Sequence, residues 1–129
     1  MLERILQTGT FLTAQGALDG YAARHAAIAE NIANANTPGY KRKVVAFEQA
    51  LQEAVQQSIS PCTGAAVGPV APFVPPVSRD TTASVLPDGN NVVLETEMSQ
   101  LAENALRYDT IALYVGRFFS GLKSVINSK

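Results

Sequence analysis

The chain has 129 residues, a length that supports one domain but not two sizeable cores. Its net charge of -1 leaves no electrostatic footprint for nucleic acid. Charged residues make up only 16% of the chain, against about 25% in ordinary soluble proteins, which indicates surface that is covered by other subunits, although an alanine-rich soluble protein would have the same composition.

The first predicted element is a long helix over residues 1–36. Its larger apolar residues recur at alternating steps of three and four, which is the spacing of a coiled-coil seam. Glycines at 9, 16 and 20 interrupt it, and each costs about 1 kcal/mol against alanine, so we expect the helix to need packing partners. The large residues of this seam are Phe11, Leu18, Tyr21, Ile28 and Ile32.

Residues 37–45 are predicted to form a fixed turn. Asn34 and Asn36 tolerate the left-handed conformation that closes helices. Pro38 and Gly39 fit the two central positions of a type II turn, where glycine supplies a positive φ. These are also ordinary helix stop signals, so a turn without further function stays open. The residues expected to form the turn and to contact a neighbouring subunit are Asn31, Asn34, Asn36, Thr37, Pro38, Gly39 and Tyr40.

The middle of the chain has a different composition. A short amphipathic helix is predicted over residues 46–57, followed over residues 58–91 by an extended, proline-rich arm that carries almost no charge. No β-hairpin is predicted there. The arm is either a disordered linker or a segment that lies along a neighbouring subunit.

A second long helix is predicted over residues 92–127, with Asn91 as its N-cap. A further apolar stripe, formed by Ile111, Phe118 and Val125, gives this helix a second face. Two long heptad helices separated by an irregular middle most simply pair with each other, so the expected fold is mainly α: two terminal helices paired as a coiled coil within one elongated domain, residues 1–129. An ordinary helical hairpin would show the same periodicity. The seam predicted on this helix consists of Leu94, Met98, Leu101, Tyr108, Val115, Phe119 and Leu122.

No constellation of residues predicts catalysis. The only histidine, His25, falls on the apolar seam, and the serines have no obvious base. The single cysteine, Cys62, allows neither an internal disulfide nor a metal site of its own. Lys41, Arg42 and Lys43 form one basic cluster, which is predicted to be solvated or to face a partner. We therefore expect no enzyme, no cofactor and no metal.

The N-terminus predicts no leader and no membrane anchor. The first ten residues lack the charged region followed by an apolar run that marks a Sec signal peptide. No stretch approaches the length of a transmembrane helix. If the protein leaves the cytoplasm, we expect it to do so without a cleaved signal peptide.

Two stretches resemble a known family. Residues 31–40, Asn-Ile-Ala-Asn-Ala-Asn-Thr-Pro-Gly-Tyr, resemble the N-terminal signature shared by bacterial flagellar rod, hook and hook-associated proteins. The C-terminal segments 88–92, 101–108 and 119–126, together with Glu95 and Glu97, are similar to the proximal rod subunits of that family. Distal rod and hook proteins carry further β domains between their helices, so this short chain resembles a proximal rod subunit, and other short rod subunits stay open.

The resemblance implies a structural subunit of the flagellar basal-body proximal rod, part of the drive shaft of the motor. Such subunits pair their terminal helices near the axis of a helical tube. They pass unfolded through the flagellar type III secretion apparatus and assemble in the periplasm. The implied partners are further copies of the chain, other flagellar rod subunits, and the membrane-ring and export-gate proteins at the rod base. The alternative is a soluble helical adaptor that binds a partner helix with the same apolar seams.

Overall fold

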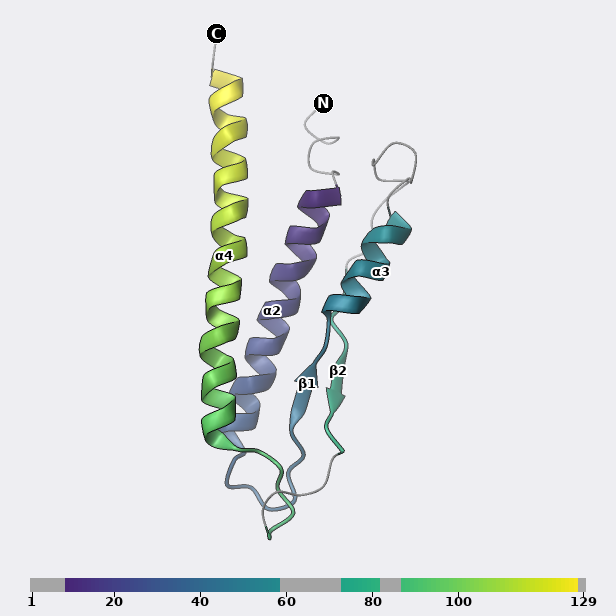
Figure 1. The fold of residues 1–129 in the computed structure, drawn as a ribbon, viewed down its shortest axis with the longest axis vertical. Coiled ribbons are helices and arrows are strands. Elements are labelled where there is room, and N and C mark those ends of the chain that lie inside the picture. The colour runs from purple at the N-terminus through teal and green to yellow at the C-terminus, as the bar shows by residue number, and fades with distance from the viewer. Residues whose placement is uncertain (1–8, 59–72, 82–86, 128–129) are drawn as a thin grey trace.

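The computed structural model describes residues 9–58, 73–81 and 87–127, so most of the proline-rich arm, Cys62 included, lies outside the described residues. Three helices and two short strands are present in this part of the chain: α2 (Gly9–Ala33), β1 (Lys43–Val45), α3 (Glu48–Ser58), β2 (Val77–Arg79) and α4 (Leu94–Asn127). α2 lies between α4 on one side and the layer of β1, β2 and α3 on the other (Figure 1). The prediction of a mainly helical fold, with two long terminal helices packed together and a short helix between them, is confirmed.

The two strands form a small sheet that was not predicted; it is not a β-hairpin, because α3 lies between the strands in the chain. β1 pairs antiparallel with β2, with Val44 opposite Ser78 and Val45 opposite Val77. β1 occupies the last three residues of the segment 37–45 that was predicted to be a turn, and β2 lies in the segment that was expected to be an extended arm. The pairing anchors this part of the arm against the chain's own layer.

The core lies between α2 and the layer that covers it. Its buried residues are Ala17, Ala27, Val45, Phe47 and Leu51.

Two glycines let α2 and this layer approach closely. A Cβ at Gly20 would overlap the ring of Phe47, and one at Gly16 would overlap the side chain of Leu51. The glycines that weaken α2 as an isolated helix therefore create the space into which its own chain packs.

α4 contacts the other side of α2 through a face that is offset from the predicted seam. The buried positions of α4 are polar, Glu97 and Asn104, and its half-buried apolar positions include Ile111 and Phe118. At the open end of the hairpin Phe11 contacts Phe118, with ring centroids 6.0 Å apart.

The residues of the predicted seam divide into two groups. Those of α2 are buried or half-buried, as are Leu101, Val115 and Leu122 of α4. Leu94, Met98, Tyr108 and Phe119 remain exposed, and Met98 keeps 59% of its surface accessible. In the monomer only some of the seam residues of α4 are therefore buried. Pairing of the two predicted seams over their full length stays a prediction. None of the described helices is long and apolar enough to cross a membrane.

Candidate functional site

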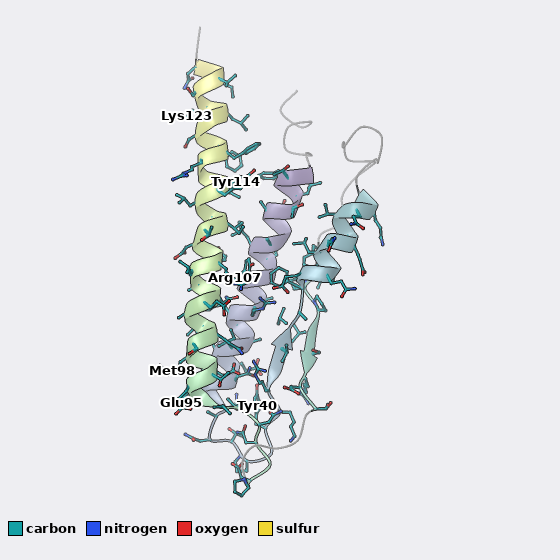
Figure 2. All side chains as sticks on the ribbon, in the orientation of Figure 1. Tyr40, Glu95, Met98, Arg107, Tyr114 and Lys123 are labelled. Atoms are coloured by element: carbon teal, nitrogen blue, oxygen red, sulfur yellow. The ribbon has the colours of Figure 1, made fainter. Side chains whose placement is uncertain are left out.

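The candidate site is the closed end of the hairpin, where α2 ends and α4 begins. Two turns meet there: the signature turn (residues 31–40) and a second turn (residues 88–92) (Figure 2, around Tyr40). Their contacts are almost entirely hydrogen bonds and ion pairs between residues far apart in the sequence.

The signature turn ends α2 with local hydrogen bonds. The Asn34 side chain donates to the Glu30 carbonyl at 2.8 Å, which satisfies one of the last carbonyls of the helix. The Tyr40 backbone N–H donates to the Thr37 carbonyl at 3.2 Å and Gly39 has a φ of 71°, as the predicted type II turn requires. Asn34 and Asn36, in contrast, do not adopt positive φ, which only glycines do among the described residues.

Asn31 is fully buried, and every hydrogen-bonding group of its side chain is used. Its amide Nδ2 donates to the Lys43 carbonyl at 2.9 Å and to Glu97 Oε2 at 3.0 Å. Its Oδ1 accepts from the Lys43 backbone N–H at 2.8 Å and from the Tyr40 hydroxyl at 3.3 Å. Asn31 thereby joins α2, β1 and α4.

Burial raises the pKa of the Tyr40 hydroxyl, and the nearby carboxylate of Glu30 raises it further. The hydroxyl consequently stays protonated as a donor to Asn31.

Glu97 is the buried charge of the site, with none of its surface exposed. Arg42 Nε donates to Glu97 Oε1 at 2.5 Å, so the charge is paired as well as hydrogen-bonded. The same guanidinium donates to Gln100 at 2.6 Å and lies 3.8 Å from Asp80. Arg42 thus ties the segment after the signature turn to α4 and to the end of β2.

Asn90 closes the site from the second turn. Its buried Nδ2 donates to the carbonyls of Asn34, Ala35 and Thr37 at 2.9–3.0 Å. These carbonyls follow the last turn of α2, so Asn90 supplies them with a donor from more than fifty residues along the chain. Asn90 Oδ1 in turn accepts from the Val92 backbone N–H at 2.7 Å.

Sequence reasoning missed the roles of three residues in this site. Asn91 was predicted to cap α4, but its Oδ1 accepts from the Arg42 backbone N–H at 2.8 Å and its Nδ2 donates to the Asp80 carbonyl at 3.2 Å. Asn90 and Glu97 carried only the family resemblance. The one available signal was the pair of adjacent asparagines beside a glycine turn.

The basic cluster is also used within the chain rather than left to solvent. Lys41 Nζ donates to the Gly89 carbonyl at 2.9 Å, and Lys43 pairs with Glu30. Four of the predicted turn residues are exposed, namely Asn36, Thr37, Pro38 and Gly39. Contact of the turn with a neighbouring subunit stays a prediction.

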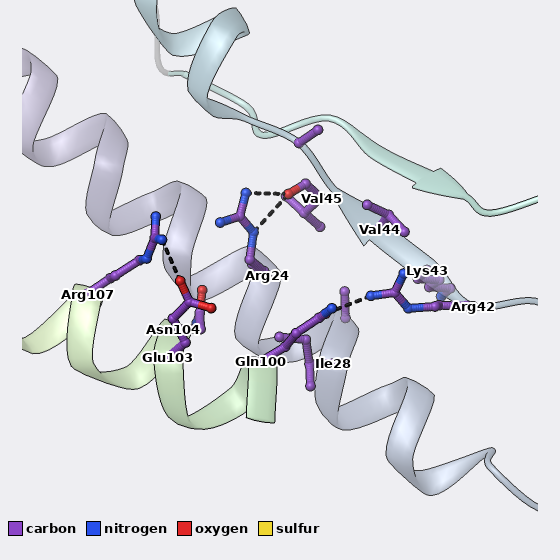
Figure 3. A pocket seen from close by; sticks show the side chains of 12 residues that line it. Arg24, Ile28, Arg42, Lys43, Val44, Val45, Gln100, Glu103, Asn104 and Arg107 are labelled. Atoms are coloured by element: carbon purple, nitrogen blue, oxygen red, sulfur yellow. Dashed lines mark hydrogen bonds and ion pairs between the residues drawn. The ribbon is translucent and has the colours of Figure 1, made fainter. Parts of the chain in front are cut away.

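A cleft of about 380 Å³ opens beside the site, between α2, α4 and β1 (Figure 3). Arg24 crosses it, donating to the Val45 carbonyl at 2.7 Å and pairing with Glu48, and its guanidinium lies 4.7 Å from the centre of the Phe47 ring. Burial by itself would raise the pKa of Glu48, but the hydrogen bond from Arg24 outweighs it and holds that pKa below its usual value. Because each cation lining this cleft is paired by the chain's own carboxylates, the cleft offers no free charge to a ligand.

No group of three or more metal-ligating side chains occurs within residues 9–58, 73–81 and 87–127. We call the hydrogen bonds and ion pairs of Asn31, Arg42, Asn90 and Glu97 the polar lock. The molecule is thus a pair of long helices joined at one end by this lock, and its longer helix exposes many apolar residues. This is the architecture of a structural subunit that packs against other helices.

Comparison with known proteins also indicates a structural subunit. Residues 11–41 match the family described as flagella basal body rod protein. The chain is 33% identical to the flagellar basal body rod protein FlgB of Aeromonas hydrophila over 89% of this chain and 90% of that protein. It is 31% identical to FlgB of Bacillus subtilis, covering 94% and 95%, and 29% identical to FlgB of Yersinia enterocolitica, covering 98% of both.

The chain is therefore a flagellar basal body rod protein, structural rather than enzymatic. Within that class it belongs to the FlgB family. The sequence had left other short rod subunits, of the FlgC or FlgF kind, as alternatives, and the relatives above support FlgB.

Proposed function

We propose that this protein polymerises through its terminal helices as a subunit of the proximal rod, and so forms part of the drive shaft of the flagellar motor. The observation that carries this proposal is the surface of α4. Leu106, Leu113, Val125 and Ile126 are 57–72% exposed; the first two share one side of the helix, and Val125 and Ile126 lie on other sides. Large apolar residues exposed on several sides of one helix indicate surface that other helices cover.

The partners that fit this proposal are further copies of the chain and other rod subunits. Rod-base neighbours of the family, the membrane-ring and export-gate proteins, are the remaining candidates. The periplasmic location and export through the type III route without a cleaved signal peptide rest on family membership.

The lock at the closed end supports a mechanical role. It joins α2 to α4 through Asn31, Arg42 and Glu97, so a torque applied to one helix is transmitted to the other by buried bonds rather than by a flexible loop. A rod subunit needs this rigidity because the rod passes rotation along its length.

The test is an in-frame deletion of the gene in its native bacterium, followed by electron microscopy of isolated basal bodies. We expect membrane rings without a rod, and restoration of the rod by a plasmid copy. Intact rods and normal swimming in the deletion strain would refute the proposal and favour a soluble adaptor that binds one partner helix.

A further inference from the structure

One face of α2 is left uncovered by the rest of the described chain. On α2 an exposed row of alanines follows the helical repeat and is not covered by the strands or by α3. The row consists of Ala22, Ala26, Ala29 and Ala33. Their small side chains leave shallow holes at heptad spacing, into which larger side chains of another helix can insert.

A second cleft, of about 360 Å³, lies beside this row between α2 and α4, and we call it the α2–α4 cleft. Asn104 lines it and is only 3% exposed. Its Nδ2 donates to the Tyr21 carbonyl at 3.0 Å, but its Oδ1 has no hydrogen-bond partner. Asp109 also lines the cleft and forms no ion pair within the described residues. An exposed carboxylate beside a buried amide oxygen without a partner is a pair of acceptors that a cationic donor of another molecule can satisfy.

The opposite side of α4 carries such a donor. Leu106, Leu113 and Arg117 are exposed and recur at steps of seven and four, so they form one ridge on the outer face of the helix. Arg117 forms no ion pair with any described residue. Between Thr110 and Asn127 the only charged residues are Arg117 and Lys123, so this half of α4 is purely basic.

The sequence spacing of the α4 ridge and of the α2 alanine row determines the register in which the two can pack. In an antiparallel arrangement, Leu113 over the hole between Ala22 and Ala29 brings Leu106 over the next hole, towards Ala33. The same register brings Arg117 next to Ala22, at the mouth of the α2–α4 cleft. In the parallel arrangement with both leucines on the row, Arg117 would lie beside the C-terminal end of α2, where the carboxylate of Glu30 is already paired with Lys43. Only the antiparallel fit joins the unpaired cation to the unpaired acceptors.

We propose that the α2–α4 cleft and the alanine row receive the outer ridge of α4 from a second copy of this chain, with Arg117 of that copy bound by Asp109 and Asn104. This assignment rests on the proposed function and names the surfaces through which it is carried out. Because ridge and row are different patches, the contact is heterologous and can repeat from copy to copy.

The test uses charge reversal in the deletion strain, with rods counted on isolated basal bodies. The wild-type plasmid copy tests the rod function by itself. Arg117→Glu should reduce rods several-fold, whereas Lys123→Glu, the same charge change off the ridge, should not. Asp109→Arg combined with Arg117→Glu should restore rods. Circular dichroism of each purified variant checks that the fold is intact.

A covalent test identifies the occupant directly. In a Cys62→Ser background, Ala26→Cys together with Leu113→Cys should give disulfide-linked copies in assembled basal bodies. Gln57→Cys on α3 replaces Ala26→Cys in the control and should give none. Failure of the double charge reversal to restore rods, or crosslinking of Leu113→Cys only to another protein, would overturn this interface. The proposed function would survive either result if the wild-type copy restores rods.

Discussion

Replacing Asn90 with alanine should strongly destabilise the monomer, because this side chain joins the second turn to the carbonyls that follow α2. The Asn90 side chain is fully buried, and its two N–H donors serve three carbonyls while its Oδ1 accepts from Val92. The three carbonyls share two N–H groups, so with the bond from Val92 the four contacts are equivalent to about three full hydrogen bonds, each with a net value of about 0.5–1.5 kcal/mol. The expected loss is therefore about 2–4 kcal/mol, a large share of the roughly 5–15 kcal/mol that stabilises a domain.

The measurement is urea unfolding of the purified chain, followed by far-UV circular dichroism. The matched control is Asn36→Ala, which removes an exposed amide from the signature turn itself and should change the free energy of unfolding by no more than about 0.5 kcal/mol. Asn91→Ala removes two hydrogen bonds and should fall between them. If Asn90→Ala and Asn36→Ala unfold at the same urea concentration, the cap on α2 contributes nothing and the reasoning fails.

Three further predictions concern packing and charge. Gly20→Ala should lower the free energy of unfolding by about 2 kcal/mol or more, because the new methyl group overlaps the buried ring of Phe47. Gly116→Ala, whose methyl group enters open space, should stabilise α4 by up to about 1 kcal/mol. Equal urea midpoints for the two variants would refute the packing argument. Glu97→Ala removes the buried carboxylate that Arg42 and Asn31 share and should cost about 3 kcal/mol, the lower end of the range for a broken buried ion pair, because Arg42 keeps Asp80 and Gln100. The exposed Glu95→Ala should cost little. The pKa of Glu48 is lowered in the folded state, so its ion pair contributes stability above the unfolded pKa and loses it as pH falls through the folded pKa. Glu48→Gln should therefore lose slightly less stability than the parent between neutral and acid pH, by well under 1 kcal/mol because the carboxylate is half exposed; an unchanged acid dependence would contradict the assignment.

The helices and the turn could be predicted because their signals are local. The heptad steps of α2 and α4 lie within one helix each, and Pro38 with Gly39 specifies a turn within four residues. The pairing of β1 with β2 could not be predicted in the same way. Val44 pairs with Ser78, which lies 34 residues further along the chain, and the proline-rich sequence before Ser78 has no periodicity, so nothing nearby in the sequence fixes the register.

The face of α4 that meets α2 was offset for a physical reason. Apolar periodicity treats polar residues as outward, but Glu97 and Asn104 are buried because Arg42 and the Tyr21 carbonyl satisfy them. Once these polar side chains point inward, Met98 is rotated towards the surface. The seam predicted from apolar periodicity therefore identifies the apolar positions of α4, but only some of them contact α2. The others remain exposed and are available to partner molecules.

The lock makes the signature turn depend on the C-terminal part of the chain. Asn90 satisfies carbonyls at the end of α2, and Glu97 accepts from the buried Asn31. A chain that stops at residue 87 lacks both partners, so buried groups at the end of α2 are left without hydrogen bonds and this end should fray. In hydrogen exchange, amides 28–34 should lose protection in the truncated chain and regain it when a peptide of residues 88–127 is added. Unchanged protection would show that the turn is complete by itself. If the chain passes N-terminus first through the proposed type III route, its N-terminal half cannot form the native end of α2 until the C-terminal half has followed, so this end folds only after transit.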